Sequence, residues 1–334
     1  MGEQPAPRRL TFVPFLRDGR CALVPLGERL ALPSGELLPG EDPLLDGSLR
    51  VPLETAGFRR QGAHELAVGG DHLVLWGVGD PGYQGSRPHA VVSLWTGGAA
   101  KAAARLRQGG DERGAAMVEA ADRARRSLDE ATFYRDGLRL MEPSYLQAGS
   151  PQGGSGFGGT AAEWRARRSQ ICQAVDRDGS FLDAGCANGH LMESVAAWCG
   201  ERGLRVEPYG VDLSAALVAE ARRRLPRWAD RIWVGNALGW EAPDGRRFDF
   251  VHTLLDLVQE PRVSELLGHL LDRVVALGGR LLVSHYVPIE QRERHPAAVL
   301  GRLGFEVGGI TEPGDPGGRP VPPTAWVVRG GCGS

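Results

Sequence analysis

The sequence lacks the features of secreted, membrane and nucleic-acid-binding proteins. No stretch approaches ~18 consecutive apolar residues, and the beginning, MGEQPAPRRLTFVPFL, has no apolar signal-peptide core. Its 5 cysteines are an odd number without a Cys-x-x-Cys pair, which fits a reducing compartment better than a disulfide framework. A net charge of −2 provides no basic footprint. We therefore expect a cytoplasmic protein with neither a membrane nor a nucleic-acid partner.

Composition and length describe an ordinary globular chain. Hydrophobic residues make up 42% and charged residues 24% of the sequence. At 334 residues the chain is longer than most single domains, so two domains are expected.

One stretch, 180–214, has the pattern of a strand, a glycine-rich turn, a helix and a second strand. The first strand leads into Asp183-Ala-Gly-Cys-Ala-Asn-Gly189, and apolar residues then recur at helical spacing over 191–198. The second strand, 206–211, ends at Asp212. Ligands of α/β sheets bind beyond the carboxyl ends of the strands, where an acidic residue can accept hydrogen bonds from ribose hydroxyls. The stretch therefore predicts a site for a nucleoside cofactor.

The glycine spacing distinguishes between cofactors. A dinucleotide fingerprint needs Gly-x-Gly-x-x-Gly, but from Gly185 onwards its second and third glycines would be Ala187 and His190. The stretch instead resembles the first motif of class I S-adenosylmethionine-dependent methyltransferases, Asp-x-Gly-x-Gly-x-Gly, with Ala187 in place of the middle glycine. This resemblance implies an α/β, Rossmann-like seven-stranded sheet and S-adenosylmethionine as cofactor. It assigns cofactor contacts to Asp183, Gly185, Ala187, Gly189, Asp212, Leu213, Asn236, Ala237 and Leu254.

Later segments follow the same family pattern. Expected strands cover 231–237, 248–256 and 278–286, a helix covers 264–277, and 305–311 with 324–329 form a closing antiparallel hairpin. The resemblance thus extends over a domain at 141–334. It places the methyl acceptor near Asp256 and His285, the two candidate catalytic bases, and no metal site is expected.

The segment before the first strand of this domain has the composition of a lid. The glycine-rich run Gly153–Gly159 is expected to form no regular element, and Thr160 with Glu163 is a capping box for the helix that follows. Lids exclude water and release product, which requires mobility. The candidate substrate or lid residues are Tyr145, Phe157, Trp164 and Tyr286; a plain interdomain linker is the alternative.

The N-terminal part, 1–98, reads as short strands with turn signals, beginning with a hairpin of 11–16 and 21–25. Its segment 32–61 resembles a Nudix box, on Gly35, Glu41, Arg50, Glu54, Gly57 and Phe58. Two box glutamates are replaced, by Val51 and Thr55, and Pro52 falls where the catalytic helix should run. Too few carboxylates remain to hold the Mg²⁺ that this hydrolysis needs. A smaller α+β domain with a structural or recognition role is therefore expected, and such domains often dimerise.

Residues 99–140 are rich in Ala, Arg and Glu and predict two helices broken at Gly109-Gly110, interpreted as a helical connector between the domains. Three functions follow from the whole pattern. The first is methyl transfer to a small-molecule acceptor, with the Nudix-like domain in support or recognising a nucleotide-containing acceptor. The alternatives are a diphosphate hydrolase with a regulatory cofactor-binding domain, and a non-catalytic S-adenosylmethionine-binding module.

Overall fold

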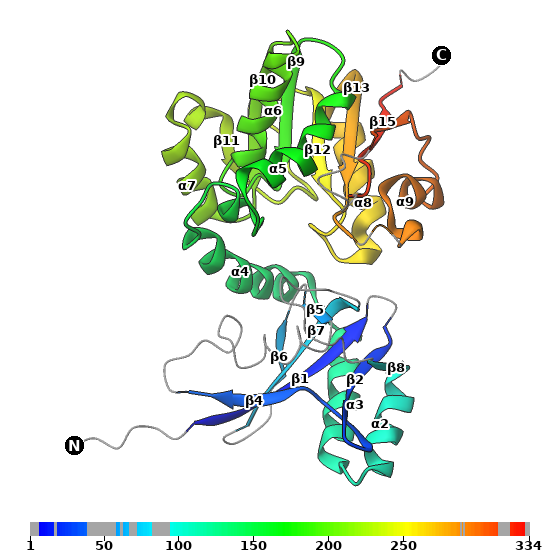
Figure 1. Ribbon diagram of the computed structural model, residues 1–334. Coiled ribbons are helices and arrows are strands. Elements are labelled where there is room, and N and C mark those ends of the chain that lie inside the picture. Colours follow the sequence, from blue (N-terminus) through cyan, green and yellow to red (C-terminus); the bar gives the residue numbers. More distant parts are fainter. Residues whose placement is uncertain are drawn as a thin grey trace, which may run out of the picture. The chain divides into compact units, whose positions relative to one another are not determined.

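The computed structural model describes residues 7–16, 19–38, 58–60, 63–66, 72–81, 94–287, 289, 291–312 and 321–330. The chain divides into two compact units, Met1–Met141 and Glu142–Ser334 (Figure 1). Within the described ranges, no helix has both the length and the apolar character needed to cross a membrane.

The first unit contains a mixed sheet, of which eight strands lie in described residues. They are β1 (Arg8–Leu16), β2 (Cys21–Leu26), β3 (Arg29–Ala31), β4 (Ser34–Leu37), β5 (Phe58–Arg60), β6 (His64–Leu66), β7 (His72–Pro81) and β8 (Trp95–Gly97). The order is β3-β2-β1-β7-β5, with β4 on β1, β6 on β7 and β8 on β2. The expected hairpin is present, because β1 and β2 pair antiparallel with Phe15 opposite Cys21.

Helices α2 (Ala99–Gln108) and α3 (Glu112–Arg126) cover one face of this sheet (Figure 1). Buried side chains of both helices, among them Leu106 and Val118, share a core with Phe15 and Trp76. The break at Gly109-Gly110 is confirmed. The two helices are therefore a layer of the first unit, since their apolar faces are used on its sheet, and they do not form a separate connector. Helix α4 (Glu130–Leu146) contains the division between the units.

Most of the Nudix-like segment lies outside the described residues. This holds for Glu41, Arg50 to Thr55 and Gly57. Gly35 lies in β4 and Phe58 begins β5. The Nudix resemblance therefore stays a prediction.

The second unit contains a seven-stranded sheet within its described residues, as expected. Its strands are β9 (Gly179–Ala184), β10 (Val206–Asp212), β11 (Ile232–Val234), β12 (Phe248–Leu254), β13 (Val275–Ser284), β14 (Gly309–Ile310) and β15 (Ala325–Val328). In the order β11-β10-β9-β12-β13-β15-β14, the first five strands are parallel, and β15 is antiparallel to both neighbours. The predicted closing hairpin is thus confirmed.

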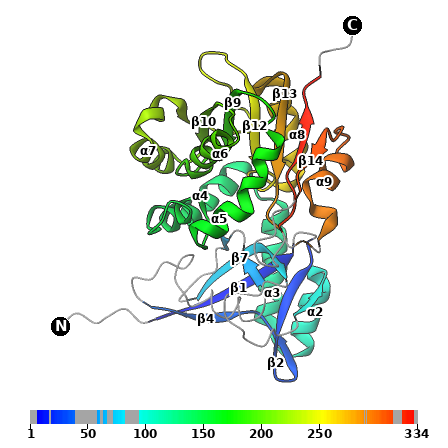
Figure 2. The same cartoon turned by 45° about the horizontal axis from the view of Figure 1, so that its top comes forward.

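Helices pack on both faces of this sheet (Figures 1 and 2). Alternate strand residues point to opposite faces, so Phe181 and Phe250 meet α6 (His190–Glu201), whereas Leu182 and Val251 meet α8 (Val263–His269). The remaining elements are η1 (Gly153–Ser155), α5 (Ala161–Arg168), η2 (Ser169–Ala174), α7 (Ala215–Arg224), η3 (Pro226–Arg231), η4 (Glu260–Arg262), η5 (Leu270–Val274), η6 (Arg292–Arg294) and α9 (Pro296–Arg302).

Two segments differ from expectation. Gly153–Ser155 forms a 3₁₀ turn, since Gly154 is buried and packs against the Tyr145 carbonyl and Asn188. The helix expected over 264–277 ends as α8 and continues as the π-helical η5, after which β13 begins at Val275.

Candidate functional site

The sheet of the second unit reverses its strand order at β9. The chain passes from β9 outwards to β10 and β11, and later returns to place β12 on the other side of β9. Ligands of such sheets bind at this switch point, beyond the carboxyl ends of the strands. Every site residue predicted from 183 to 286 lies in this region of the chain, at or just after the end of β9, β10, β11, β12 or β13.

The loop after β9 has an unusual backbone. Gly185, Ala187 and Gly189 have φ values of 89°, 47° and 77°. A side chain on either glycine would also crowd a leucine, because an added Cβ would lie 2.8 Å from Leu257 or Leu225. Ala187 is the one non-glycine with positive φ among the described residues, at a cost of roughly 1–2 kcal/mol.

Asp212, at the end of β10, holds this loop. Its Oδ2 accepts a hydrogen bond from the Ala187 amide at 2.8 Å, and its Oδ1 accepts one from the Ser214 amide at 2.8 Å. The residue is only 6% exposed, and burial raises the pKa of its carboxyl, while the two amides favour the charged form. Each carboxylate oxygen retains a second lone pair for a ligand hydroxyl. The arrangement therefore fits a bound ribose, and it also explains how alanine is tolerated at 187.

Asn188 fastens the preceding segment to the same loop. Its Oδ1 accepts from the Ser155 hydroxyl at 2.7 Å and from the His190 amide at 3.1 Å, and its Nδ2 donates to the Pro151 carbonyl at 2.8 Å. Arg224 donates to its carbonyl at 2.7 Å. The glycine-rich segment is thus bound directly to the predicted cofactor loop.

A chain of buried polar groups runs under the loop. Asp183 Oδ1 lies 2.9 Å from His252 Nδ1, His252 Nε2 lies 3.1 Å from the Ser284 hydroxyl, and Ser284 lies 2.8 Å from the Thr324 hydroxyl. All four residues are 2% exposed or less. Asp183 therefore begins a chain of hydrogen-bond contacts within the sheet, which links β9 through β12 and β13 to Thr324, the residue before β15.

Three of the four predicted substrate or lid residues surround one arginine. The guanidinium carbon of Arg168, the last residue of α5, lies 3.3 Å from the centre of the Tyr286 ring, 5.2 Å from Trp164 and 5.5 Å from Phe157. Trp164 is only 4% exposed and donates its indole N–H to Ser194 at 3.0 Å. It therefore anchors α5 on α6. The predicted capping box of α5 is present.

The fourth predicted substrate or lid residue, Tyr145, lies against the glycine turn, where a Cβ on Gly156 would overlap its hydroxyl. Asp256 is exposed just beyond β12. His285 is buried, and its Nδ1–H donates to the Arg294 carbonyl at 3.0 Å. Burial raises the pKa of the Tyr286 phenol, while the Arg168 charge and a hydroxyl contact from Ser284 lower it.

The remaining predicted cofactor residues follow the strand ends. Leu213 is half-buried directly after Asp212, and Leu254 closes β12. Beyond β11, Asn236 accepts the Leu238 amide at 3.1 Å, and Ala237 is buried.

Sequence reasoning did not single out Asn188, Ser284 or Arg168 as site residues. A signal existed for Arg168, which follows Trp164 by four positions and so shares its helix face. A polar residue within a glycine-rich loop was the signal for Asn188. Ser284 had none, because its partners come from other strands.

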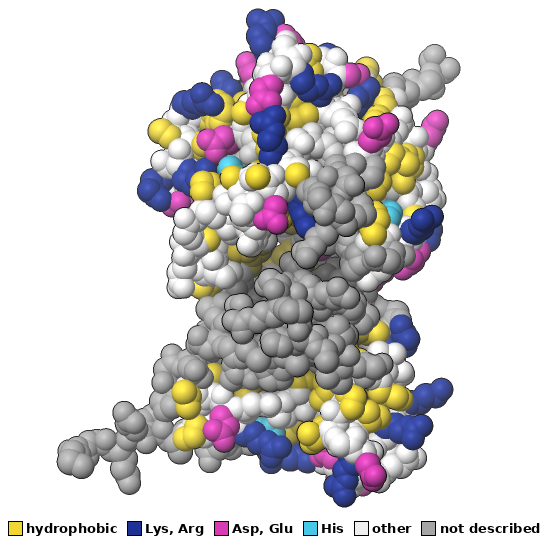
Figure 3. Space-filling view, viewed as in Figure 1, with side chains coloured by type: hydrophobic (Ala, Val, Ile, Leu, Met, Phe, Trp, Pro, Cys, Tyr) yellow, Lys and Arg dark blue, Asp and Glu magenta, His cyan; other side chains and the backbone are white. Residues whose placement is uncertain are grey.

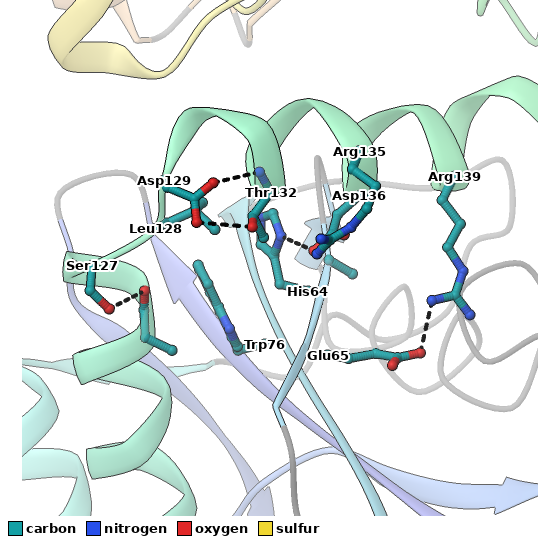
Figure 4. Close-up of a pocket in the computed structure, with 12 residues that line it drawn as sticks. His64, Glu65, Trp76, Ser127, Leu128, Asp129, Thr132, Arg135, Asp136 and Arg139 are labelled. Atoms are coloured by element: carbon teal, nitrogen blue, oxygen red, sulfur yellow. Dashed lines mark hydrogen bonds and ion pairs between the residues drawn. The ribbon is translucent and has the colours of Figure 1, made fainter.

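A cavity lies wholly in the first unit and has a volume of about 410 Å³ (Figure 4). His64 Nδ1 lies 2.8 Å from Asp136 Oδ2, and the His64 ring lies 4.5 Å from the Trp76 ring. At one side Arg139 pairs with Glu65 at 3.0 Å. The cavity is therefore lined by both polar and apolar side chains, and it lies between α4 and β6 (Figure 4).

Residues 181–279 match the family described as "Methyltransferase domain". This region holds the loop after β9, Asp212 and the strand ends through β12. The chain therefore contains, within its second unit, a region that is similar to a methyltransferase domain. A comparison with curated proteins finds no match.

Solved structures similar to this chain include a SAM-dependent methyltransferase from Aquifex aeolicus, 16% identical, with a TM-score of 0.39 over 51% of this chain and 93% of that one. Another is 1,6-didemethyltoxoflavin-N1-methyltransferase from Burkholderia thailandensis with bound 1,6-didemethyltoxoflavin and S-adenosylhomocysteine. It is 17% identical, with a TM-score of 0.41 over 58% of this chain and 89% of that one.

Proposed function

We propose that the protein transfers a methyl group from S-adenosylmethionine to a small-molecule acceptor bound beyond β12 and β13. The observation that carries this proposal is Asp212, whose buried carboxylate fixes the loop after β9 and retains acceptor capacity for ribose hydroxyls. The cofactor supplies an activated methyl group on sulfur. The protein is left to position the acceptor, exclude water and, where the acceptor is a weak nucleophile, remove a proton.

The residues around Arg168 suit positioning and desolvation. Phe157 and Trp164 come from the segment before β9, and Tyr286 comes from the end of β13, so these rings join the lid to the acceptor side of the sheet. Asp256 is the exposed carboxylate that follows β12, which suits it as the base for an acceptor O–H or N–H. His285 is the second candidate, since donation by its Nδ1–H leaves Nε2 as the basic nitrogen.

For the first unit we propose a structural or recognition role. Its cavity has a volume of about 410 Å³, large enough for a small ligand, and His64, Asp136 and Glu65 bring polar groups to it, which favours recognition. A Nudix-like fold and a nucleotide-containing acceptor are part of this proposal. On the side shown in Figure 3, acidic and basic side chains are interspersed over the described surface of each unit.

Calorimetric titration of S-adenosylhomocysteine into wild type and Asp212→Ala tests the main proposal. Loss of a charge-assisted contact to the ribose should weaken binding about 10- to 100-fold, or ~1.5–3 kcal/mol. Asp244→Ala is the matched control, because Asp244 is an exposed aspartate that precedes β12, and it should bind as wild type does. Equal affinity of wild type and Asp212→Ala would contradict the proposal. Binding without methylation of any acceptor would favour a non-catalytic module.

A further inference from the structure

The cation at the centre of the acceptor side has no paired anion among the residues that the structure describes. Arg168 makes no hydrogen bond or ion pair with any described residue, although its guanidinium is enclosed by the rings of Tyr286, Trp164 and Phe157. Burial lowers the pKa of Arg168, and Asp256 acts on this cation only through space, without an ion pair. On the same helix, by contrast, Arg165 pairs with Glu201. Charges withdrawn from water are normally paired in proteins, so half-buried Arg168, with no pair among the described residues, is unusual.

Two neighbouring side chains also have polar atoms without a hydrogen-bond partner among the described residues. The Tyr286 hydroxyl oxygen is buried and forms no hydrogen bond of ordinary geometry with the described residues. The Nε of Arg167 is likewise buried without a partner among them, and the Arg167 guanidinium lies 5.9 Å from the Phe157 ring. Unsatisfied donors of this kind cost about 1–3 kcal/mol each and call for an explanation. Here all three are donors, so an acceptor group would satisfy them.

We propose that the methyl acceptor carries a carboxylate, which binds Arg168 and the Tyr286 hydroxyl and so orients the acceptor for methylation. This inference rests on the proposed methyl transfer. A carboxylate accepts from a guanidinium fork and a phenol at once. One negative charge balances Arg168, and Asp256, which opposes any anion here, opposes a carboxylate less than a phosphate dianion. The three rings favour an aromatic body for this acceptor, since ring pairs add to the energy of burial.

Binding to the S-adenosylhomocysteine-loaded protein tests the proposal with a matched pair of probes, 4-hydroxybenzoate and its uncharged methyl ester, followed by calorimetry. The acid should bind at least tenfold more tightly than the ester. In Arg168→Gln this preference should vanish. The affinity for the acid should fall by about 10- to 100-fold, and the affinity for the ester should stay unchanged. Arg168→Lys, which keeps the charge without the fork, should retain part of the preference. Arg165→Gln on the same helix should behave as wild type.

Equal binding of acid and ester, or binding of neither, overturns the inference. A fall in S-adenosylhomocysteine affinity in Arg168→Gln, with the preference for the acid unchanged, also overturns it, because Arg168 would then hold the carboxylate of the cofactor. Thermal unfolding of both Arg168 variants shows whether they fold. Failure of the methyltransferase proposal is distinguishable, since wild type would then not bind S-adenosylhomocysteine at all.

Discussion

At the scale of single residues, Asp212 is subject to opposing influences on its pKa. Burial raises it, and so do the charges of Asp183 and Glu142, whereas the amides of Ser214 and Ala187 lower it. Burial is the largest of these causes, so the net pKa lies above the ordinary aspartate value. A ribose hydroxyl donates to the ionised carboxylate, and protonation removes that acceptor. If Asp212 binds the ribose as proposed, we expect cofactor binding to depend on pH through this residue.

We predict that affinity for S-adenosylhomocysteine falls on acidification at a higher pH than an ordinary aspartate would cause. The sign follows from the raised pKa, because the carboxyl of the free protein takes up its proton earlier as the pH drops. Dissociation constants measured between about pH 4 and 8 check this, with circular dichroism to verify folding. Asp212→Asn should bind more weakly throughout and lack the same pH step. An identical step in Asp212→Asn would exclude Asp212 as its source.

The residue pattern predicts this part of the site and fails elsewhere for a physical reason. The loop after β9 and Asp212 could be assigned from spacing, since a glycine-rich turn and the end of the next strand are local features. The contact between His252 and Ser284 depends on the register of β12 against β13, in which Leu254 rather than His252 lies opposite Ser284. Such register is a long-range property that spacing does not encode.

At the scale of elements, α5 carries the functional argument. It has eight residues, too few for an isolated helix to be stable in water. Its stability must therefore come from its capping box at Thr160 and Glu163 and from Trp164, which binds Ser194 on α6. Because Arg168 is its last residue, the position of that cation depends on the cap and on this anchor.

We predict that Thr160→Ala lowers the free energy of unfolding by about 1 kcal/mol, because the Glu163 amide loses its capping oxygen. Urea denaturation followed by circular dichroism measures the change. Thr160→Ser retains a hydroxyl at the same position and should stay close to wild type. If both variants lose stability equally, the capping bond is not the cause.

Elements were predictable where their signals are local. The capping box, the break at Gly109-Gly110 and the hairpin of β1 and β2 all follow from residues within a few positions of one another. The prediction that α2 and α3 form a connector was wrong, because a helix with an Ala-rich face gives no indication of which sheet it covers. The π-helical η5 has no signal in its sequence, Leu270–Val274, that separates it from the α-helix before it.

At the scale of the whole chain, the two units have separate cores. One core joins the sheet of the first unit to α2 and α3, and others join the sheet of the second unit to its own helices. Separate cores predict separate unfolding transitions, since two-state behaviour is a property of single domains. A ligand stabilises the unit that binds it, by RT ln(1 + [L]/Kd).

We therefore predict that differential scanning calorimetry resolves two unfolding transitions. S-adenosylhomocysteine should raise the midpoint temperature of only one of them. At a hundred times Kd the stabilisation is about 2.7 kcal/mol, which moves the transition of a domain of this size by roughly 5–11 °C. Asp212→Ala should reduce the shift at the same ligand concentration and leave the other transition in place. Nucleotides that occupy the His64–Asp136 cavity should raise that other transition instead. A shift of both transitions by one ligand would show that the unfolding of the two units is coupled, and would contradict the assignment of each site to its own unit.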